Sequence, residues 1–244
     1  MPPSNKTNKR KAPSGEAISS EVTPNQVFIG AAWYNVRPKY ERAIAKLRTK
    51  YPLSFTIVGR EATQDAEDLL NIIKNRIESS SYAIFDATAG NPNVSLEFGF
   101  AEARDIPRAL YLSTHKAAKK PADAPIIADL AGKRRNHYAQ EAGLKTLLRS
   151  FCNSHPYTKR FEAFMAQKFS KAKKGKKHRA RALALKVIHF IDGKPEVRRP
   201  DLVLHLQADK AGYTTDEIDD MIRKLHSAGL VRSLQGPYST VRIT

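Results

Sequence analysis

The chain has 244 residues, enough for one domain with its own hydrophobic core and a smaller second unit. Its formal net charge of +18 and pI near 10.0 favour a polyanionic partner, above all nucleic acid, over a merely soluble basic protein. A single cysteine, Cys152, excludes a disulfide framework and a site of several thiolates, and no apolar run is long enough to span a bilayer.

The N-terminal segment lacks the apolar core of a signal peptide, so a cytoplasmic location is expected. Residues 1–24 are polar and rich in Lys, Ser, Asn and Pro. Such a segment buries too little apolar surface to offset its ordering entropy, which predicts a disordered tail. The seven histidines show no spacing typical of metal ligands, so no metal site is expected.

Strand and helix patterns alternate over residues 25–157, which indicates an α/β domain with a parallel sheet covered on both faces. Apolar residues at helical spacing predict one helix that begins near Pro38 and another that passes through Leu69, Ile73 and Ile77. Short apolar runs predict the strands Val27–Ala31, Ser54–Val58, Ser81–Phe85, Ala109–Leu112 and Pro125–Ala128.

The composition turns strongly basic over residues 158–178, which we treat as a basic helix and linker. Phe161, Phe164 and Phe169 predict that its early part is a helix docked on the first domain. The lysines that crowd around Gly175 predict that its later part is an exposed hinge.

Residues 179–244 predict a separate small unit of three helices and a terminal β-hairpin. The first helix ends at Gly193, and the second spans Pro200–Leu206. The third begins with the capping box Thr214-Thr-Asp-Glu217 and stops at Gly229. This order of elements resembles a winged helix-turn-helix domain.

The segment that follows the strand Ser81–Phe85 places two carboxylates, Asp86 and Glu97, at a strand-to-helix joint. Pro92 and Asn93, a good N-capping residue, predict that the next helix begins near them. Glu97 then lies about one turn into the helix, where backbone dipoles favour the ionised carboxylate. In an α/β sheet this is the mouth of the ligand crevice, where a carboxylate can attack or stabilise an electron-poor sugar carbon. From spacing alone, an ordinary first-turn acid explains Glu97 equally well.

The run from Asp86 through Asn91-Pro-Asn-Val94 to Glu97-Phe-Gly-Phe-Ala101 resembles the signature of the nucleoside 2-deoxyribosyltransferase-like family, a relative of the TIR-like glycohydrolases. The resemblance covers roughly residues 25–150 and implies a flavodoxin-like parallel sheet. It implies that Glu97 is the catalytic residue and that Asp86 contacts the sugar or the base. Cleavage of an N-glycosidic bond by such a pair requires no metal.

Four further residues are candidate substrate contacts. Asn91 and Asn93 can bind ribose or phosphate oxygens, although both are also ordinary turn and cap residues. Arg60 follows a strand end and can pair with a phosphate, and Gly30 can let a ligand approach the backbone. A surface arginine and a tight turn explain these two equally well. For Asp86, the alternative role is capping of the turn that follows it.

One departure from the family concerns the first strand. Family members usually have a tyrosine there that orients the catalytic Glu, and this chain has Phe28. They also complete the pocket with residues of a neighbouring subunit, and the sequence leaves the oligomeric state open. Both points disfavour base exchange between nucleosides. They leave water or a macromolecule as the acceptor. The family residues that this chain retains fit hydrolysis of NAD or a related nucleotide, as the TIR-like relatives perform, with NAD as substrate and no separate cofactor.

Contacts with nucleic acid are expected from exposed basic side chains rather than from insertion of the third helix into a groove. That helix starts with Asp216, Glu217, Asp219 and Asp220, which would repel phosphates. Phosphate contacts hold a nucleic acid without specifying its sequence. The candidate phosphate contacts are Lys171, Lys173, Lys174, Lys176, Lys177, Arg179, Arg181, Arg198, Arg199, Arg232 and Arg242. A solvated linker is the alternative for the lysine run, and the acidic helix can instead dock on a basic protein.

A deoxyribosyltransferase-like domain followed by a winged helix resembles the effector proteins of type II bacterial retrons. The resemblance implies an antiphage toxin that is held inactive by a reverse transcriptase and its branched RNA–DNA product. The sequence therefore predicts an N-glycosidase effector that acts on NAD or a related nucleotide. Two alternatives remain open: a nucleotide-sensing, DNA-binding transcription regulator, and a nucleoside 2-deoxyribosyltransferase proper.

Overall fold

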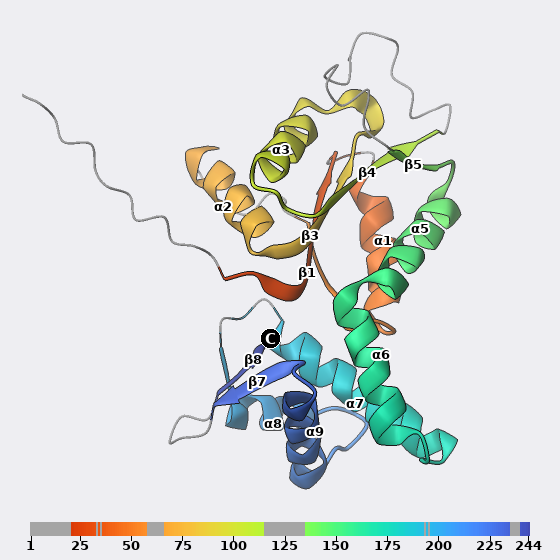
Figure 1. Ribbon diagram of the computed structural model, residues 1–244, viewed down its shortest axis with the longest axis vertical. Coiled ribbons are helices and arrows are strands. Elements are labelled where there is room, and N and C mark those ends of the chain that lie inside the picture. The colour runs from red at the N-terminus through yellow and green to blue at the C-terminus, as the bar shows by residue number, and fades with distance from the viewer. Residues whose placement is uncertain are drawn as a thin grey trace, which may run out of the picture.

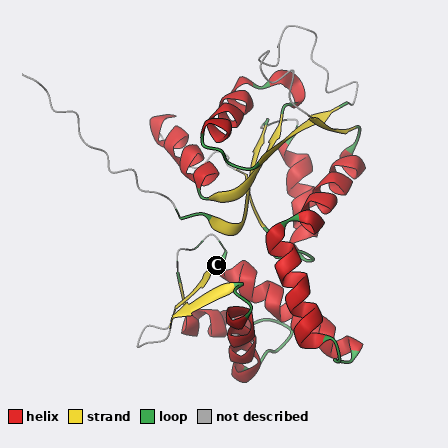
Figure 2. Cartoon of the chain, viewed as in Figure 1, coloured by secondary structure: helices red, strands yellow, loops and turns green. Residues whose placement is uncertain are grey.

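The structure, a computed structural model, describes residues 21–32, 34, 36–57, 66–114, 135–192, 194, 196–234 and 240–244. Figures 1 and 2 show two parts, a sheet with helices on both of its faces and a smaller part made mostly of helices. The long helix α6 leads from the first part to the second (Figure 1).

The first part is built on a parallel sheet with strand order β2-β1-β3-β4-β5. The helices α2 and α3 cover one face, and α1 and α5 cover the other (Figure 1). The strands are β1 (Thr23–Ala31), β2 (Ser54–Ile57), β3 (Ser80–Asp86), β4 (Arg108–Ser113) and β5 (Arg135–Tyr138). The helices are α1 (Arg37–Arg48), α2 (Ala66–Glu78), α3 (Pro92–Ala103) and α5 (Glu141–Ser154). The predicted α/β fold with a parallel sheet is confirmed.

Alternate residues of the neighbouring strands β1 and β3 pack on opposite faces of the sheet. Phe28 and Phe85 lie in the apolar cluster under α3, and their ring centroids are 5.8 Å apart. Their neighbours Ile29 and Ile84 belong to the cluster under α1. This alternation follows from the two-residue period of a strand, and the burial of both faces explains why these strands appear in the sequence as continuous apolar runs.

Four of the predicted strands and all three predicted helices of this part are confirmed, to within one or two residues for most ends. The range 125–128, predicted as the fifth strand, lies outside the described residues. The fifth strand of the sheet is β5, whose sequence Arg-Asn-His-Tyr has no apolar run, so it was not predicted. The helix α5 was also not predicted, and it buries Leu144, Leu148 and Cys152.

The start of β1 lies earlier than predicted. Thr23 and Pro24 already belong to the strand, although the predicted tail extends to residue 24. The backbone N–H of Thr23 donates to the carbonyl of Ser79 at 2.8 Å, which joins this end of the strand to the turn before β3. Pro24 lacks an N–H and is tolerated near the start of a strand. Residues 1–20 lie outside the described residues.

The basic segment is helical where a hinge was predicted. Helix α6 (Pro156–Phe169) buries all three phenylalanines named above, as expected for a docked helix. Helix α7 (Lys174–Ile191) begins within the lysine run, and Gly175 is its second residue. The predicted hinge is therefore wrong, although its lysine side chains are exposed as expected. Lys and Arg are good helix formers, and the apolar residues later in α7 anchor a helix that extends back through them.

The second part contains α7, β6 (Val197–Arg198), α8 (Arg199–Gln207), α9 (Thr215–Ser227), β7 (Val231–Leu234) and β8 (Thr240–Ile243). The three strands form an antiparallel sheet of order β6-β8-β7. The predicted capping box is confirmed: Glu217 N donates to Thr214 Oγ1 at 3.2 Å, and Thr214 N donates to Glu217 Oε2 at 3.0 Å. Gly229 ends α9 at a φ of +64°, which a side chain would disfavour. The three helices and the hairpin are confirmed, and the winged-helix assignment stays a prediction.

One apolar cluster runs through both parts of the molecule, from β1 and α1 through α6 and α7 to α9 and β8. Polar contacts accompany it. The hydroxyl of Tyr157 donates to the carbonyl of Leu230 at 2.7 Å, and Arg181 Nη2 donates to the carbonyl of Lys50 at 2.9 Å. The small unit is therefore packed on the sheet domain through a shared core.

Candidate active site

Helix α3 brings Glu97 to the sheet. The N-cap is Asn91, whose side-chain oxygen accepts from the backbone N–H of Asn93 at 2.9 Å, and Pro92 is the first helical residue. The helix therefore begins before Asn93, which was predicted to be the cap. Proline is well suited to the first helical position because that residue's N–H has no partner within the helix. Glu97 lies in the second turn, beyond the strongest field of the helix N-terminus.

Gly30, the penultimate residue of β1, makes room for the Glu97 carboxylate. A Cβ atom added at Gly30 would lie 2.5 Å from Glu97 Oε2 and 2.7 Å from Phe85 Cδ1, closer than real Cβ contacts allow. Gly30 is paired in register with Phe85 of β3. The carboxylate therefore rests against the backbone of β1 at the carboxyl end of the sheet, where α/β folds bind their ligands.

The surroundings of Glu97 are apolar. Phe85 packs against Phe28 and also edge-on against Phe98, with a centroid distance of 5.5 Å to the latter. Within the described ranges, no group donates a hydrogen bond to the Glu97 carboxylate, and Phe28 lacks the hydroxyl that a tyrosine would supply. Burial therefore raises the pKa of Glu97 from 4.5 to about 7. The ionised form expected from the helix dipole is disfavoured because desolvation outweighs a dipole one turn away.

A small hollow of about 140 Å³ adjoins Glu97 between α2 and α3. Its other walls are almost entirely apolar and include Ile73, Ile77 and Phe100. Leu70 and Leu96 also line it and are unusually exposed for leucine, at 38% and 62%. A carboxyl group in this setting meets an apolar surface on one side and the end of β1 on the other.

Asp86 has a different environment. It is the last residue of β3 and is completely buried. Its Oδ2 accepts from the hydroxyls of Tyr40 at 2.9 Å and Tyr138 at 2.7 Å, and its Oδ1 accepts from the backbone N–H of Thr88 at 3.0 Å. Burial raises the pKa of Asp86, and the bonds from Thr88, Tyr138 and Tyr40 oppose that rise.

The two carboxylates lie on opposite faces of the sheet. Phe85 packs under α3 with Glu97, so the next residue, Asp86, faces α1 and reaches Tyr40 on that helix. In this structure Asp86 accepts hydrogen bonds from Tyr40, Tyr138 and Thr88, and its predicted contact with a sugar or base stays a prediction. Its alternative role, capping of the turn at Thr88, is confirmed. Asp86 instead ties together α1, β3 and β5.

The remaining predicted substrate contacts are placed only in part. The side-chain oxygen of Asn91 serves as the helix cap, as its alternative role requires, and Asn93 is exposed. Arg60 lies outside the described residues. So do residues 33, 35, 58–65 and 115–134, which follow the carboxyl ends of β1, β2 and β4. Among the predicted site residues that the structure describes, Glu97 and Gly30 are brought into contact at this edge.

The basic residues predicted to contact phosphates divide into two groups: exposed lysines, and arginines of which most form ion pairs within the chain. Lys171, Lys173, Lys174, Lys176 and Lys177 are exposed around the start of α7.

Most of the predicted arginine contacts are engaged in ion pairs within the chain. Arg179 pairs with Glu217, Arg181 with Glu162, Arg198 with Asp201, Arg199 with Asp219, and Arg242 with Glu21. Arg232 is exposed. These pairs also neutralise part of the acidic start of α9, which weakens the expected repulsion of phosphates.

The sequence did not indicate that two tyrosine hydroxyls, those of Tyr40 and Tyr138, donate hydrogen bonds to Asp86. Tyr40 and Tyr138 lie 46 and 52 residues from Asp86 along the chain, so no local pattern connects the three. The available signal was the alternation within β3, which places neighbouring side chains on opposite faces of the sheet.

Two classes of feature are absent from the described part of the chain. The described residues contain no group of three or more His, Cys, Asp or Glu side chains that could hold a metal ion. No helix described there combines the length and the apolar character needed to cross a membrane.

Comparison with known proteins gives distant likenesses. No family model and no curated protein sequence matches the chain. One similar solved structure is a 2-deoxyribosyltransferase from Leishmania mexicana, with 13% identity and a TM-score of 0.42, covering 54% of this chain and 99% of that one. Another is a CMP N-glycosidase from Clostridium botulinum, with 17% identity and a TM-score of 0.36, covering 52% and 98%. Likeness this distant assigns no activity, so the function is argued from the chain's own residues.

Proposed function

We propose that this chain is an N-glycosidase that cleaves the bond between a base and C1′ of ribose in NAD or a related nucleotide, with Glu97 as the catalytic carboxylate. The observation that carries the proposal is the position of Glu97. Its carboxylate lies against Gly30 at the carboxyl end of β1, in apolar surroundings and beside a hollow.

The chemistry follows from where charge develops. As the C1′–N bond breaks, its electron pair goes to the nitrogen of the leaving base, and positive charge grows on C1′ and the ring oxygen. An ionised Glu97 close to C1′ stabilises that charge or bonds to C1′ directly. Water then adds its oxygen to C1′ and releases a proton, and where Glu97 has bonded to C1′ that bond breaks in the same step and its electron pair returns to the carboxylate. In apolar surroundings the attraction between carboxylate and developing cation is stronger than in water.

The raised pKa of Glu97 favours a substrate that brings positive charge. With a pKa of about 7, Glu97 is partly protonated near neutral pH in the ligand-free molecule. A cationic base such as the nicotinamide ring of NAD would lower that pKa by direct attraction and so favour the reactive carboxylate. It also leaves as a neutral molecule without needing a proton. These two properties support NAD over nucleotides with neutral bases.

The test combines two variants of the full-length chain. Base release from NAD and from common nucleotides is followed by chromatography. Glu97→Gln keeps the size of the side chain and should abolish release. Gly30→Ala keeps the charge but crowds the carboxylate, and it should lower kcat by tenfold or more.

The matched control is Gly99→Ala. Gly99 lies in α3, the helix that carries Glu97, and a Cβ added there has no atom within 4 Å. The variant should retain full activity. Base release by folded Glu97→Gln at the rate of the unaltered chain would refute the proposal.

We also propose that the chain binds nucleic acid through the lysines around the start of α7. The five exposed lysines there are the support, since none of them forms an ion pair with a described residue. Replacing all five by Gln should weaken binding to DNA or RNA and flatten its salt dependence, because fewer counterions are released. Equal salt dependence in the two proteins would exclude this surface. Retention by a retron reverse transcriptase and its RNA–DNA product is proposed on the sequence resemblance alone, and co-purification of the three components tests it.

A further inference from the structure

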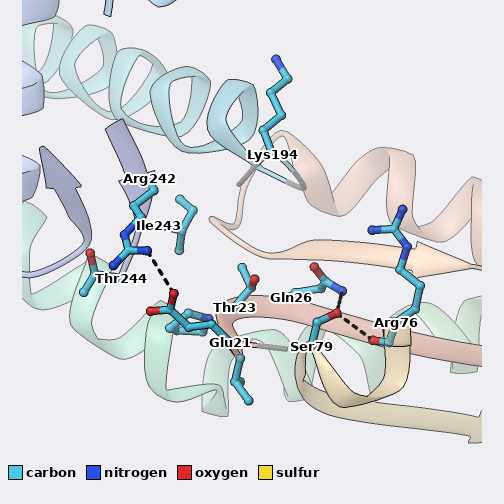
Figure 3. Close-up of a pocket in the computed structure, with 11 residues that line it drawn as sticks. Glu21, Thr23, Gln26, Arg76, Ser79, Lys194, Arg242, Ile243 and Thr244 are labelled. Carbon is cyan, nitrogen blue, oxygen red and sulfur yellow. Dashed lines mark hydrogen bonds and ion pairs between the residues drawn. The ribbon is translucent and has the colours of Figure 1, made fainter. Parts of the chain in front are cut away.

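A cleft of about 420 Å³ lies where the amino end of β1 meets the carboxyl end of β8 (Figure 3). It is separate from Glu97: the lining residue of β1 nearest to that site is Gln26, four residues before Gly30, which Glu97 contacts. At about 3.3 Å per residue, this separates the two places by roughly 13 Å along the strand. The cleft is therefore not part of the proposed active site.

Three cationic side chains from different elements surround the cleft. Arg76 comes from α2, Lys194 follows α7, and Arg242 comes from β8. Figure 3 shows them on different sides of the cleft, so both parts of the molecule contribute. Arg76 forms no ion pair with a described residue, and the Lys194 ammonium lies 3.7 Å from the centre of the Phe190 ring.

Neutral polar groups lie between these cations. Gln26 Nε2 donates to Ser79 Oγ at 3.2 Å and to Ser80 Oγ at 3.1 Å, and Ser79 Oγ donates to the carbonyl of Arg76 at 3.3 Å. Thr23 lies beside them in Figure 3. The bonds hold the polar wall in one arrangement, so a ligand would meet a preformed surface rather than one that must be ordered.

The acidic side chain among the described residues lining the cleft is Glu21, which pairs with Arg242 at 3.0 Å. Glu21 is 79% exposed, and such surface pairs contribute little to stability. A phosphate carries more charge and more acceptor oxygens than a carboxylate, so it can replace Glu21 beside the Arg242 guanidinium.

We propose that this cleft is a second binding site, which takes a phosphorylated nucleoside. The guanidinium groups of Arg76 and Arg242 would hold the phosphate, and the polar wall would meet the sugar. Val22, Pro24 and Ile243 supply apolar surface for the base. The volume suits such a ligand, since small-molecule sites occupy roughly 300–1,000 Å³. Because both parts of the molecule line the cleft, the bound ligand would connect them. The site goes beyond the proposed glycosidase activity and does not depend on it.

Binding is measured by calorimetry in the full-length Glu97→Gln protein, so that turnover at the proposed active site cannot interfere. The probes are AMP, inorganic phosphate, and hexathymidylate with either a 5′-phosphate or a 5′-hydroxyl. AMP should bind more tightly than phosphate. The hexathymidylate pair distinguishes a free nucleotide from the phosphorylated end of a strand, and preference for its 5′-phosphate form identifies the strand end as a source of the same ligand chemistry.

The combined Arg76→Gln and Arg242→Gln variant should bind AMP at least tenfold more weakly. Lys46→Gln, which removes the same kind of charge from an exposed position on α1, should bind as the parent does. Glu21→Gln removes the competing carboxylate and should bind AMP several-fold more tightly. The proposal is overturned if the arginine variant binds AMP as tightly as Lys46→Gln does, or if AMP binds no better than phosphate.

Discussion

Replacing Glu97 by Gln should stabilise the protein while abolishing its proposed activity. Burial raises the pKa of Glu97 from 4.5 to about 7 in the folded state. The folded chain therefore holds a proton that the unfolded chain has released between these two pH values. Stability from this group falls as pH rises from about 4.5 to about 7, and the cost is complete above pH 7. Gln resembles the protonated acid and does not carry this cost.

The size of the effect follows from the two pKa values. Each unit between them corresponds to about 1.4 kcal/mol, so moving from 4.5 to about 7 costs about 3 kcal/mol. Partial exposure of the side chain reduces the expected value to about 2–3 kcal/mol. The variant should therefore exceed the unaltered protein by that amount at pH 8 and by almost nothing at pH 4.5.

The assay is urea unfolding of both proteins at a series of pH values from 4.5 to 8, followed by circular dichroism. Glu196→Gln is the matched control, because Glu196 is an exposed acid without an ion pair among the described residues, and its replacement should change stability by less than about 0.5 kcal/mol at every pH. A Glu97→Gln protein that is no more stable at pH 8, or equally stabilised at pH 4.5 and pH 8, would refute the burial argument.

Three other predictions concern the stability of the fold. Tyr138→Phe removes a hydroxyl that donates to buried Asp86 and should lower the free energy of unfolding by about 1–3 kcal/mol, measured in urea. Burial lowers the pKa of His155 to about 4, so its protonation in the unfolded state should destabilise the protein as pH falls from 6.5 to 4. His155→Asn retains a capping acceptor for α6 and should lose less stability as pH falls over this range. If the free energy of unfolding of the variant falls with pH as steeply as that of the unaltered protein, His155 is not the cause. Thr214→Ala breaks the capping box with Glu217 and should cost about 1 kcal/mol; an unchanged melting temperature would contradict it.

The pH effects of His155 and Glu97 have opposite signs over much of the same range. Protonation of the unfolded histidine destabilises the fold as pH falls, whereas release of the Glu97 proton destabilises it as pH rises. The unaltered protein can therefore show a nearly flat pH profile. For this reason each variant is compared with the unaltered protein at the same pH.

The elements with local signals were predicted well. The strand before Asp86 is a continuous apolar run, and the third helix of the small unit begins at a capping box whose two hydrogen bonds join residues three apart. The fifth strand carried a weak local signal because it has no apolar run, whereas α5 has apolar residues at helical spacing, such as Leu144 and Leu148, and could have been predicted from them. The lysine run was misjudged as a hinge, because exposed lysines occur equally on linkers and on solvent-facing helices, and only the packing of the later α7 residues decides between them.

By itself, the sequence determined the alternation of strands and helices, the joint that carries two carboxylates, and the concentration of positive charge. These properties depend on neighbours within a few residues or on composition alone. The tertiary structure decided what each carboxylate does. It placed Asp86 between tyrosines about fifty residues away and Glu97 against a glycine of another strand, and it matched many of the arginines with acids. Desolvation and pairing act through space, so the protonation of a side chain and its access to a ligand depend on contacts that local sequence does not encode.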